Sequence, residues 1–454
     1  MASRNAWPTS GSVPTTSDGA PVVTGGWRRR GFLGLTAGAG LAAFTSACGA
    51  GGTSDAGASD AQTLTVACEG GGKIELQPVV DKFQRDTGST VTLVELPYDG
   101  LFNRLTSELS NGKPSFDVCA VDAVWLPLFA GKLAPIDKLF TDEVKNDLFP
   151  ALVSEAQVDG TFVGMPVWTN TEILLYRKDL FDDAKEKSAF AAKYGYPLAP
   201  PTTWQQFTDV ATFFTRPGQQ LYGTDVKGAV ETEWLAHVLQ AGSPGVVLDD
   251  NGAVIVDNAQ HVAALAFYAD LNNKHKVAPS GAAQTDWNAA QNLFNQGQTA
   301  MTRFWAHAYR QIPADAKVAG KVGAAPMIGG TAGVAGIPGP WYLSAPQGGA
   351  KQDLAEQFIK AAYDDNALSI DTSLGLAARK SAYQQYADKP GFESFGPLLT
   401  TLNASATKAR PATPHWQRIV DSVLIPTIQK ALTPGADYAA LLKAARTQIE
   451  GIIK

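Results

Sequence analysis

The sequence predicts an α/β fold in which the body of the chain is divided between two lobes. Strand-like runs at 64–67, 90–96 and 116–121 are separated by segments of helical length, and this alternation is typical of βαβ units with a parallel sheet. The 454-residue chain is longer than one hydrophobic core usually serves, so two lobes are expected. From residue 353 onward the pattern is mainly helical and ends in a helix over 438–453.

Local spacing justifies the individual elements. After the first strand, apolar residues recur at helical spacing until Gly88, which predicts a helix over 76–87. A second helix is expected at 101–109, between the second and third strands. Further along, Thr202 or Thr203 is expected to cap a helix over 204–214. Mixed helix and strand patterns continue from 246 to 344.

The N-terminal segment has the features of an export signal. Arg29 and Arg30 precede Gly31-Phe32-Leu33, and an uncharged run ends in small residues before a cysteine. A basic region, an apolar region and a small-residue processing site compose a signal peptide. Adjacent arginines followed by Phe-Leu resemble the twin-arginine variant. The apolar run is shorter than the ~20 residues that span a bilayer, so we expect residues 1–47 to be a cleaved signal.

Cys48 is the expected lipidation site. It follows Thr45-Ser46-Ala47, which resembles a bacterial lipobox although Thr45 stands where Leu is usual. The alternative is an ordinary cleaved signal with an incidental cysteine. Charge, length, small residues and cysteine agree, and together they favour a lipoprotein. Residues 48–62 are rich in Gly, Ala, Ser, Thr and Asp, which predicts a flexible tether. The body is thus expected on the extracellular face of a bacterial cell membrane.

The charge balance excludes one class of partner. The whole chain has 37 basic and 43 acidic residues. The leader contains Arg4, Arg28, Arg29, Arg30 and Asp18. Without it the chain has 33 basic and 42 acidic residues, a net charge of -9. Nucleic-acid binding needs lysine and arginine to replace counterions, so no nucleic-acid partner is expected. A second long apolar run is also missing from the sequence, which predicts no transmembrane segment.

Two further cysteines end short strand-like runs. An oxidising exterior would permit Cys68 and Cys119 to form a disulfide, but twin-arginine export usually carries proteins that are already folded. The alternative is two buried thiols that behave as small hydrophobic residues. Both interpretations stay open on the sequence.

Catalytic and cofactor motifs are scarce. The five histidines are scattered and show no zinc-binding spacing, and there is neither a Gly-x-Ser-x-Gly elbow nor a phosphate loop. The glycine-rich stretch at 329–336 lacks the strand-then-helix context of a dinucleotide site. Asp122 and Glu172 are conceivable as a glycosidase pair, although such carboxylates equally accept hydrogen bonds from sugar hydroxyls. We therefore expect neither an enzyme nor a cofactor or metal site.

Aromatic residues gather at the predicted ends of elements. Trp125 follows the third strand, and the other tryptophans stand beside polar residues. Sugar rings present C–H faces to flat aromatic rings while their hydroxyls need acceptors, so aromatic residues beside carboxylates and amides on loops suit a carbohydrate pocket. Each tryptophan alone is more simply a core residue. As a set they favour a binding site, and the members are Trp125, Trp168, Trp234, Trp305 and Trp341.

These segments, in order, resemble the carbohydrate-binding lipoproteins of ABC importers, the maltodextrin-binding-protein-like solute-binding proteins. The resemblance covers roughly residues 60 to 454, and no single motif decides it. The segments that carry it are Phe116–Trp125, Leu133–Asp137, Met165–Phe181, Pro201–Phe207, Phe294–Met301, Leu374–Tyr383 and Arg410–Trp416.

The resemblance implies a two-lobed periplasmic-binding-protein-like fold of type II, with each lobe built from discontinuous chain. Residues 63–168 and 302–345 would form the first lobe, and 169–301 with 346–454 the second. Hinge crossings are expected near 168–172, 300–305 and 341–350. A ligand would lie in the cleft between the lobes.

Ligand contacts carried over by position come from both lobes and the hinge. At Trp305 the sequence departs from the family pattern, which often has Gly-Pro-Trp in place of Phe304-Trp305-Ala306. Arg379 has a surface or interlobe ion pair as its alternative role. The expected contacts are Glu69, Gly70, Gly71, Tyr98, Asp122, Trp125, Trp168, Asn170, Tyr222, Glu231, Trp234, Trp305, Trp341 and Arg379.

The function that the resemblance implies is capture of a disaccharide, oligosaccharide or polyol and its delivery to a membrane ABC permease by a monomeric, lipid-anchored receptor. Hinge closure over the cleft would be the mechanism. One alternative is a secreted glycoside hydrolase that uses Asp122, Glu231 or Glu233. Another keeps the fold but binds a cationic osmolyte or other small solute, since aromatic residues also attract cations.

Overall fold

A computed structural model describes residues 62–249, 251–386 and 388–454 of the chain. The predicted signal peptide, Cys48 and nearly all of the predicted tether lie outside these ranges. All described residues belong to one compact unit that spans 55–454. Across the described ranges, no helix combines the length and the apolar character needed to cross a bilayer.

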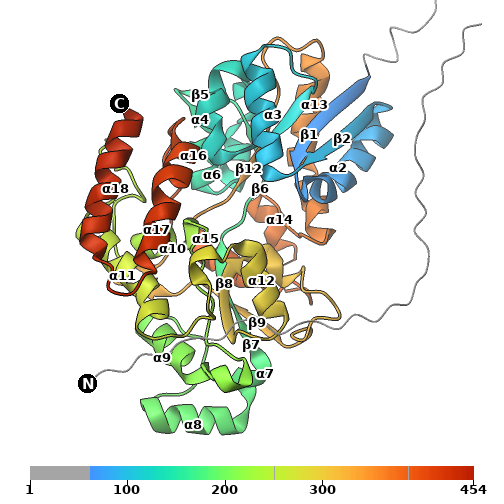
Figure 1. Cartoon of the computed structure of the whole chain (residues 1–454). Helices are drawn as coiled ribbons and strands as arrows, with labels where there is room; N and C mark the ends of the chain where they lie inside the picture. The colour runs from blue at the N-terminus through green and yellow to red at the C-terminus, as the bar shows by residue number, and fades with distance from the viewer. Residues whose placement is uncertain (1–61, 250, 387) are drawn as a thin grey trace, which may run out of the picture. The chain divides into compact units, whose positions relative to one another are not determined.

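The first sheet has five strands in the order β2-β1-β3-β12-β6 (Figure 1). β1, β2 and β3 are parallel, as predicted, while β12 runs antiparallel to both β3 and β6. The third strand begins two residues later than predicted, because 116 and 117 lead into it. The strands are β1 (Thr63–Glu69), β2 (Thr90–Leu96), β3 (Val118–Asp122), β6 (Met165–Trp168) and β12 (Trp341–Ser344).

Helices cover this first sheet. α2 contacts β1 and β2, α3 contacts β1, and α13 packs on α2 and β6. The crossovers after β1 and β2 run in opposite directions, so the right-handed rule puts α2 and α3 on opposite faces. Shorter helical segments follow β3 along the chain. The helices are α2 (Gly72–Thr87), α3 (Tyr98–Ser110), η1 (Ala123–Trp125), α4 (Leu126–Phe129), η2 (Ala130–Lys132), η3 (Asp137–Leu139), α5 (Asp142–Asp147), α6 (Pro150–Ala156), α13 (Gln352–Asp364), η7 (Asn366–Asp371) and α14 (Lys380–Gln384).

The second sheet has three antiparallel strands in the order β8-β7-β9. It lies with α7 to α9 and α12 in the lower part of Figure 1. Two small two-stranded pairings complete the strands. The strands are β7 (Glu172–Arg177), β8 (Met301–Trp305), β9 (Val322–Ala325), and the pairs β4 (Gln157–Val158) with β5 (Thr161–Phe162) and β10 (Gly329–Gly330) with β11 (Gly333–Val334).

The helices of the second sheet include the predicted helix over 204–214. Thr203 caps it, because its hydroxyl accepts a hydrogen bond from the Gln206 backbone N–H at 3.2 Å. The helices are α7 (Lys178–Asp182), α8 (Ala184–Tyr194), α9 (Trp204–Phe214), η4 (Pro217–Gln219), α10 (Thr232–Gln240), α11 (Ala259–Asn273), η5 (Ala282–Gln284), α12 (Trp287–Asn295) and η6 (Ala306–Tyr309).

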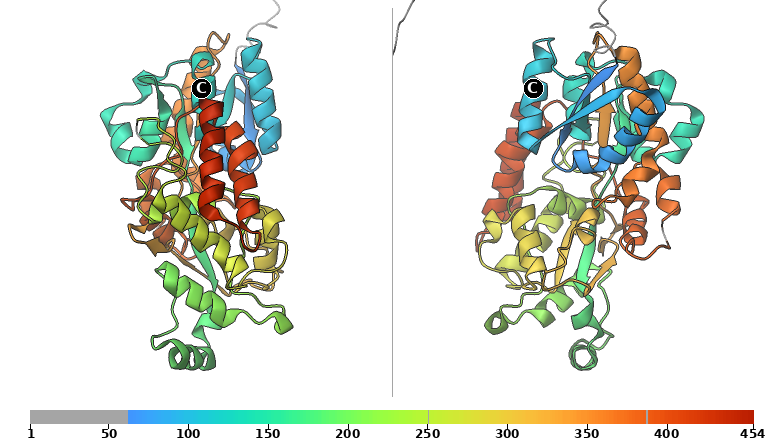
Figure 2. Two further views of the ribbon diagram at one scale, coloured as in Figure 1. Left: turned by 60° about the vertical axis from the view of Figure 1, so that its left-hand side comes forward. Right: turned by 90° about the vertical axis from the view of Figure 1, so that its right-hand side faces the viewer.

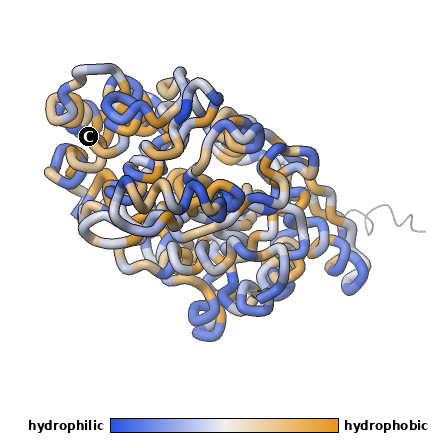
Figure 3. The backbone as a smooth tube through the Cα atoms, turned by 90° about the horizontal axis from the view of Figure 1, so that it is seen from below, coloured by the Kyte–Doolittle hydropathy of each residue, from blue (hydrophilic) through white to orange (hydrophobic). Residues whose placement is uncertain are grey.

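The C-terminal third is mainly helical, as predicted. α15 packs on β7 and β9, while α17 and α18 pack on α11 and α16 contacts η1 beside the first sheet. Two views show the C-terminal helices running alongside both sheets (Figure 2). The elements are α15 (Phe395–Leu402), α16 (Trp416–Ile419), the π-helical segment η8 (Val420–Leu424), α17 (Ile425–Ala431) and α18 (Tyr438–Ile453). Hydrophobic and hydrophilic stretches alternate along the backbone (Figure 3), as expected for elements that bury one face.

The sheets place three segments differently from the sequence prediction. Residues 302–325 were expected in the first lobe, but β8 and β9 both pair with β7 of the second sheet. Strand pairing thus puts residues 301–305, where a hinge crossing was expected, within the second sheet. The crossing expected at 341–350 comes earlier, between β11 and β12, because β12 already belongs to the first sheet. Residues 352–384, expected in the second lobe, include α13, which packs on β6 of the first sheet, and η7 and α14, which follow it on the same side, with η7 against α2. Each of these segments is placed by contacts with strands that are far away in the sequence.

The two strand-end cysteines are free, buried thiols. Cys119 is the register partner of Ala67, not of Cys68. Since adjacent residues in a strand point to opposite faces of a sheet, the two sulfur atoms lie on different faces. Burial raises the pKa of Cys68 to about 12. Both thiols therefore act as core side chains.

Candidate functional site

The candidate site lies at the carboxyl edge of the first sheet. β1 ends at Glu69 and β3 at Asp122, and Tyr98 opens the helix after β2. In the antiparallel register, Trp341 of β12 lies opposite Asp122 on one side and Trp168 on the other. Carboxyl ends of parallel strands meet at one edge, where α/β proteins commonly bind ligands. Side chains from distant segments are thereby brought together.

A cleft of about 730 Å³ opens at this edge. A volume of this size suits a small-molecule ligand. The opposite wall comes from the second sheet, its helices and the C-terminal segment. The lining residues that the sequence had predicted are Glu69, Gly70, Tyr98, Asp122, Trp168, Asn170, Glu231, Trp305 and Trp341.

Aromatic rings form one floor of the cleft. Trp168 and Trp341 are stacked, with ring centroids 6.4 Å apart and planes at 29°. Tyr98 meets Trp341 edge-on at 6.0 Å. Trp125 was expected to contact ligand, but it is 1% exposed and lies beneath Tyr98 and Trp341, with centroids 4.6 and 5.5 Å away. It supports the rings that face the cleft.

Asp122 is the centre of the polar floor. Its carboxylate accepts the Tyr98 hydroxyl at 2.9 Å and the Arg410 guanidinium at 3.0 Å. Both partners of the ion pair are less than a tenth exposed. Burial acts to lower the pKa of Arg410, but the neighbouring Asp122, Tyr98, Glu231 and Glu155 raise it above its usual range. The guanidinium is therefore a permanent donor in the cleft.

Besides Asp122, the carboxyl groups of Glu69, Glu231 and Asp421 line the cleft. Burial raises the pKa of Glu69 well above its ordinary value, with smaller contributions from Asp122 and other carboxylates. Burial also raises the pKa of Glu231, while Arg410 partly offsets the effect. One oxygen of Glu69, Oε2, is buried without a hydrogen-bond partner among the described residues. Buried polar atoms are normally paired, so this oxygen is suited to a ligand hydroxyl.

The hinge side of the cleft is built around Asn170. Its backbone oxygen accepts the Gly339 N–H at 2.8 Å, and its side-chain oxygen accepts the Ala306 N–H at 3.1 Å. Gly339 is close to Trp305, because a Cβ at this glycine would stand 2.9 Å from the indole ring. Asn170 thus joins the chain between β6 and β7 to the chain that leads into β12 and to the end of β8.

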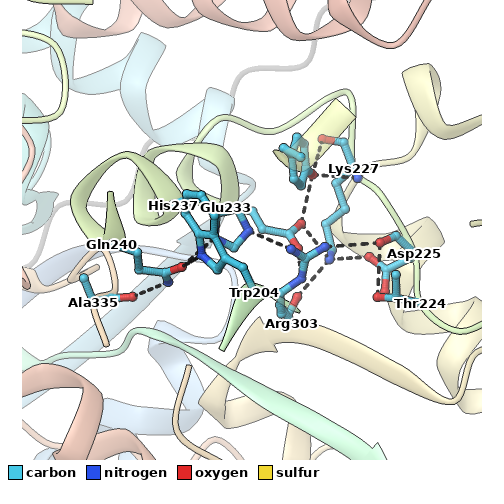
Figure 4. Close-up of polar contacts among 10 residues, drawn as sticks. Trp204, Thr224, Asp225, Lys227, Glu233, His237, Gln240, Arg303 and Ala335 are labelled. Atoms are coloured by element: carbon cyan, nitrogen blue, oxygen red, sulfur yellow. Dashed lines mark hydrogen bonds and ion pairs between the residues drawn. The ribbon is translucent and has the colours of Figure 1, made fainter. Parts of the chain in front are cut away.

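An ionic cluster lies buried next to the cleft wall (Figure 4). Lys227 is paired with Asp225 and, at 3.1 Å, with Glu233, and Arg303 lies 2.6 Å from Glu233. All four side chains are at most 1% exposed. The Lys227 ammonium also lies 5.2 Å from the ring centre of Trp287, which lines the cleft. The cluster therefore fixes the wall rather than contacting a ligand.

The remaining predicted contacts lie outside the cleft lining. Gly71 adopts a positive φ of 95° and donates its N–H to Glu95. Trp234 is fully buried, and Tyr222 forms an isolated bridge with Thr299. Arg379 forms an ion pair with Asp147 at 2.7 Å, which is the alternative role considered for it. The side chains of these residues do not point into the cleft. Position in a strand or loop does not by itself fix the direction of a side chain, so the sequence could not show this.

Sequence reasoning missed several lining residues. Arg410 and Trp416 bound a segment that carried the family resemblance, yet nothing in the sequence shows that Arg410 reaches Asp122 of β3 or that Trp416 lines the cleft. Trp287 follows an Asp286 helix cap, and this position gave only a weak signal. The lining residues not predicted are Thr232, Trp287, Asn288, Gln291, Phe304, His307, Gln311, Gly339, Leu374, Leu376, Arg410, Trp416, Gln417, Val420, Asp421 and Ile425.

This arrangement offers aromatic faces, carboxyl groups, amides and one arginine. In the described part of the chain, no three His, Cys, Asp or Glu side chains are grouped as metal ligands would be. The fold and the cleft define a two-lobed binding protein of the type II periplasmic-binding-protein fold. Residues 70–367 match the family model described as bacterial extracellular solute-binding protein, and the chain belongs to this family. Its members bind solutes and are not enzymes, as expected from the sequence.

Two relatives illustrate the similarity. A probable ABC transporter-binding protein of Deinococcus radiodurans is 29% identical over 301 residues, which cover 63% of this chain and 68% of the relative. A mannitol-binding protein of Pseudomonas aeruginosa is 26% identical over 251 residues, which cover 54% and 55% of the two chains. The second match thus spans about half of each protein.

Solved structures agree on the fold. A maltose-bound binding protein of T. maritima has a TM-score of 0.71 at 24% identity and covers 86% of this chain and 99% of its own. An ABC transporter solute-binding protein of Agrobacterium vitis with bound D-mannitol has a TM-score of 0.64 at 25% identity, with 86% and 97% covered.

Proposed function

We propose that the protein captures a sugar or polyol in the cleft and delivers it to the permease of an ABC importer. One observation carries the proposal: stacked indole rings of Trp168 and Trp341 adjoin the acceptors and donors of Asp122, Glu69 and Arg410. Aromatic faces suit the C–H surface of a sugar, and the polar groups suit its hydroxyls. The Pseudomonas relative and the Agrobacterium structure, which are described with mannitol, support a polyol.

A thermal-shift screen of the mature protein tests this proposal. A solute that binds only the native state raises the melting temperature by mass action. The panel contains mannitol, ribitol, hexoses, maltose and longer oligosaccharides. A concentration-dependent rise with at least one of them is expected. No rise with any sugar or polyol contradicts the proposal, and turnover of an oligosaccharide during incubation contradicts a pure binding role.

A second candidate ligand is a solute with an amino group. Glu69, Glu231 and Asp421 line the cleft, and Arg410 is already paired with Asp122. Such an excess of carboxyl groups also suits a cation beside aromatic rings. The same screen therefore includes amino sugars and quaternary ammonium osmolytes. A larger shift with a cationic solute than with its neutral counterpart favours this candidate.

We also propose that the protein is anchored to the outer face of the membrane through Cys48 and exported by the twin-arginine route. The support is the sequence of the leader, since these residues lie outside the described ranges. Such an anchor would keep the protein with its bound solute at the membrane, near the permease. In a bacterial host that lipidates exported proteins, Cys48→Ser is expected to move the protein from the membrane fraction to the soluble fraction. Unchanged membrane association contradicts the lipid anchor.

A further inference from the structure

His307 is a cleft residue that neither the sequence nor the proposed contacts account for. It lies in η6, directly after β8, and its partly exposed ring lines the cleft. Its Nδ1 lies 2.6 Å from the side-chain nitrogen Nδ2 of Asn170. A neutral imidazole has one donor nitrogen and one acceptor nitrogen. Which nitrogen faces the cleft as a donor depends on how the Asn170 amide is oriented.

Two backbone groups fix the orientation of the Asn170 amide. Its Oδ1 accepts the N–H of Thr171 at 3.0 Å and the N–H of Ala306 at 3.1 Å. A flipped amide would point its NH2 group at these two N–H donors. The Ala306 N–H would keep its hydrogen bond to the Thr171 carbonyl oxygen at 3.1 Å, but the Thr171 N–H would lose its acceptor. Leaving buried donors unpaired is costly, and Asn170 is only 5% exposed. The NH2 group therefore faces His307.

The orientation of the amide determines the tautomer of His307. Because Asn170 Nδ2 donates, Nδ1 of His307 must accept, and the ring proton must be on Nε2. Burial lowers the pKa of His307 to about 4, which agrees with a neutral ring at physiological pH. Within 62–249, 251–386 and 388–454, no protein group makes a hydrogen bond with Nε2. The ring thus has one committed nitrogen and one available donor.

We propose that His307 is a specificity-determining residue, held by Asn170 as the Nε2–H tautomer so that this N–H donates to an oxygen of the bound solute. The proposal rests on the proposed function and adds one requirement to it. The solute must present a hydroxyl, ether or ring oxygen as an acceptor at the hinge side of the cleft. Glu69 and Asp122, at the carboxyl edge of the first sheet, present acceptors instead.

His237 offers an internal reference with the opposite tautomer (Figure 4). Its Nε2 lies 2.6 Å from Nη1 of Arg303, which can only donate, and its Nδ1 lies 2.8 Å from Oε1 of Gln240. Gln240 Nε2 donates to the Ala335 carbonyl oxygen at 2.8 Å, which fixes that amide. The ring proton of His237 is therefore on Nδ1. One protein thus contains both tautomers in neutral rings.

The first test needs no ligand. Long-range proton–nitrogen NMR spectra report which ring nitrogen carries the proton when the protein is labelled with 15N-histidine. The signals of His307 are assigned by their loss in His307→Gln. The expected pattern is Nε2–H for His307 and Nδ1–H for His237 at neutral pH. Asn170→Asp places an acceptor at Nδ1, so His307 is expected to gain an Nδ1 proton while His237 stays unchanged. An Nδ1–H tautomer or an imidazolium at His307 in the unaltered protein overturns the proposal.

The second test measures affinity for the solute that gives the largest thermal shift. His307→Gln keeps an N–H near the position of Nε2, whereas His307→Leu has a similar bulk and no donor. Leucine is expected to weaken binding by about 10-fold, the upper range for one hydrogen bond, and glutamine by clearly less. Equal losses for the two variants, or no loss for leucine, overturn the donor role. If no sugar or polyol binds the unaltered protein, the proposed function fails and the donor role with it, while the NMR result still decides the tautomer.

Discussion

Individual residues of the cleft divide into those that face the solute and those that hold them in place. Trp341 has both contacts, because it stacks on Trp168 and rests edge-on against the buried Trp125. Asp122 is similarly held by Tyr98 and Arg410. A side chain fixed in this way loses little conformational entropy when a ligand binds, which favours affinity.

Trp341→Ala tests the aromatic floor. Removing the indole deletes the face on which a sugar would stack, so affinity for the best solute is expected to fall at least tenfold, or about 1.4 kcal/mol. Isothermal titration measures the change. Trp204→Ala is the matched control, since Trp204 stacks on Phe267 at 4.5 Å outside the cleft lining. The control is expected to lower the melting temperature without changing affinity, and an unchanged affinity in Trp341→Ala would show that the floor is elsewhere.

The sequence predicted the cleft residues whose position follows from a strand end. Glu69, Asp122, Trp168 and Trp341 stand at one edge of the first sheet, and the family resemblance named them by their positions along the chain. Arg410 could not be predicted in this way. Its contact with Asp122 joins positions 288 residues apart through a loop with no regular spacing.

Among the elements, α10 and β8 share the buried ionic cluster. Glu233 lies in the first turn of α10 and Arg303 in the middle of β8. The same two elements supply Glu231, at the cap of α10, and Trp305, at the end of β8, to the cleft. A charge pair with no access to water is weak evidence for stability by itself, but breaking it leaves an unpaired buried charge. The structure of this cleft wall therefore depends on the few side chains of the cluster.

Lys227→Met is expected to destabilise the protein by about 3–5 kcal/mol, because Asp225 and Glu233 then lose their shared cation in a buried site. Equilibrium unfolding in urea, with the linear extrapolation, gives the value. Lys360→Met is the matched control at an exposed pair with Asp364, and it is expected to cost less than about 1 kcal/mol. Similar losses in both variants would contradict a role for the buried cluster.

A second prediction at this scale concerns Glu155 of α6. Burial raises the pKa of Glu155 to about 8, and its Oε2 lies 3.1 Å from the Tyr342 hydroxyl, which donates to the Leu152 carbonyl oxygen at 3.0 Å. A protonated Glu155 can donate to that hydroxyl, so the folded state prefers the neutral acid. With a folded pKa above the unfolded one, this stability is fully present below about pH 4.5 and is lost as pH rises through about 8.

Glu155→Gln keeps a neutral donor and removes the titration. Melting temperatures of the two proteins are expected to diverge as pH rises from about 5 to about 8, with the unaltered protein becoming the less stable. Differential scanning calorimetry across this range measures the divergence. A constant difference at every pH would mean that Glu155 is not protonated in the folded protein.

For the molecule as a whole, the strand alternation near the N-terminus predicted the α/β fold and the parallel core of the first sheet. The division of the later segments was harder. β8 and β9 join β7, while β12 returns to the first sheet, and the short strands in this region have similar apolar patterns. Only pairing with distant partners decides which sheet each one joins. The leader and Cys48 are predictions from sequence features that the described residues do not include.

Closure around the solute is the prediction that belongs to the whole molecule. The cleft is lined from both sheets and from the C-terminal segment, so a solute that contacts all of them stabilises the form in which they are closest. Small-angle X-ray scattering of the mature protein is expected to show a smaller radius of gyration at saturating solute, approaching the ~21 Å of a compact body of this length. Trp341→Ala is expected to need at least tenfold more solute for the same decrease. A radius that does not change while calorimetry shows saturation would mean that the cleft binds without closing, and that delivery to a permease depends on some other recognition of the bound form.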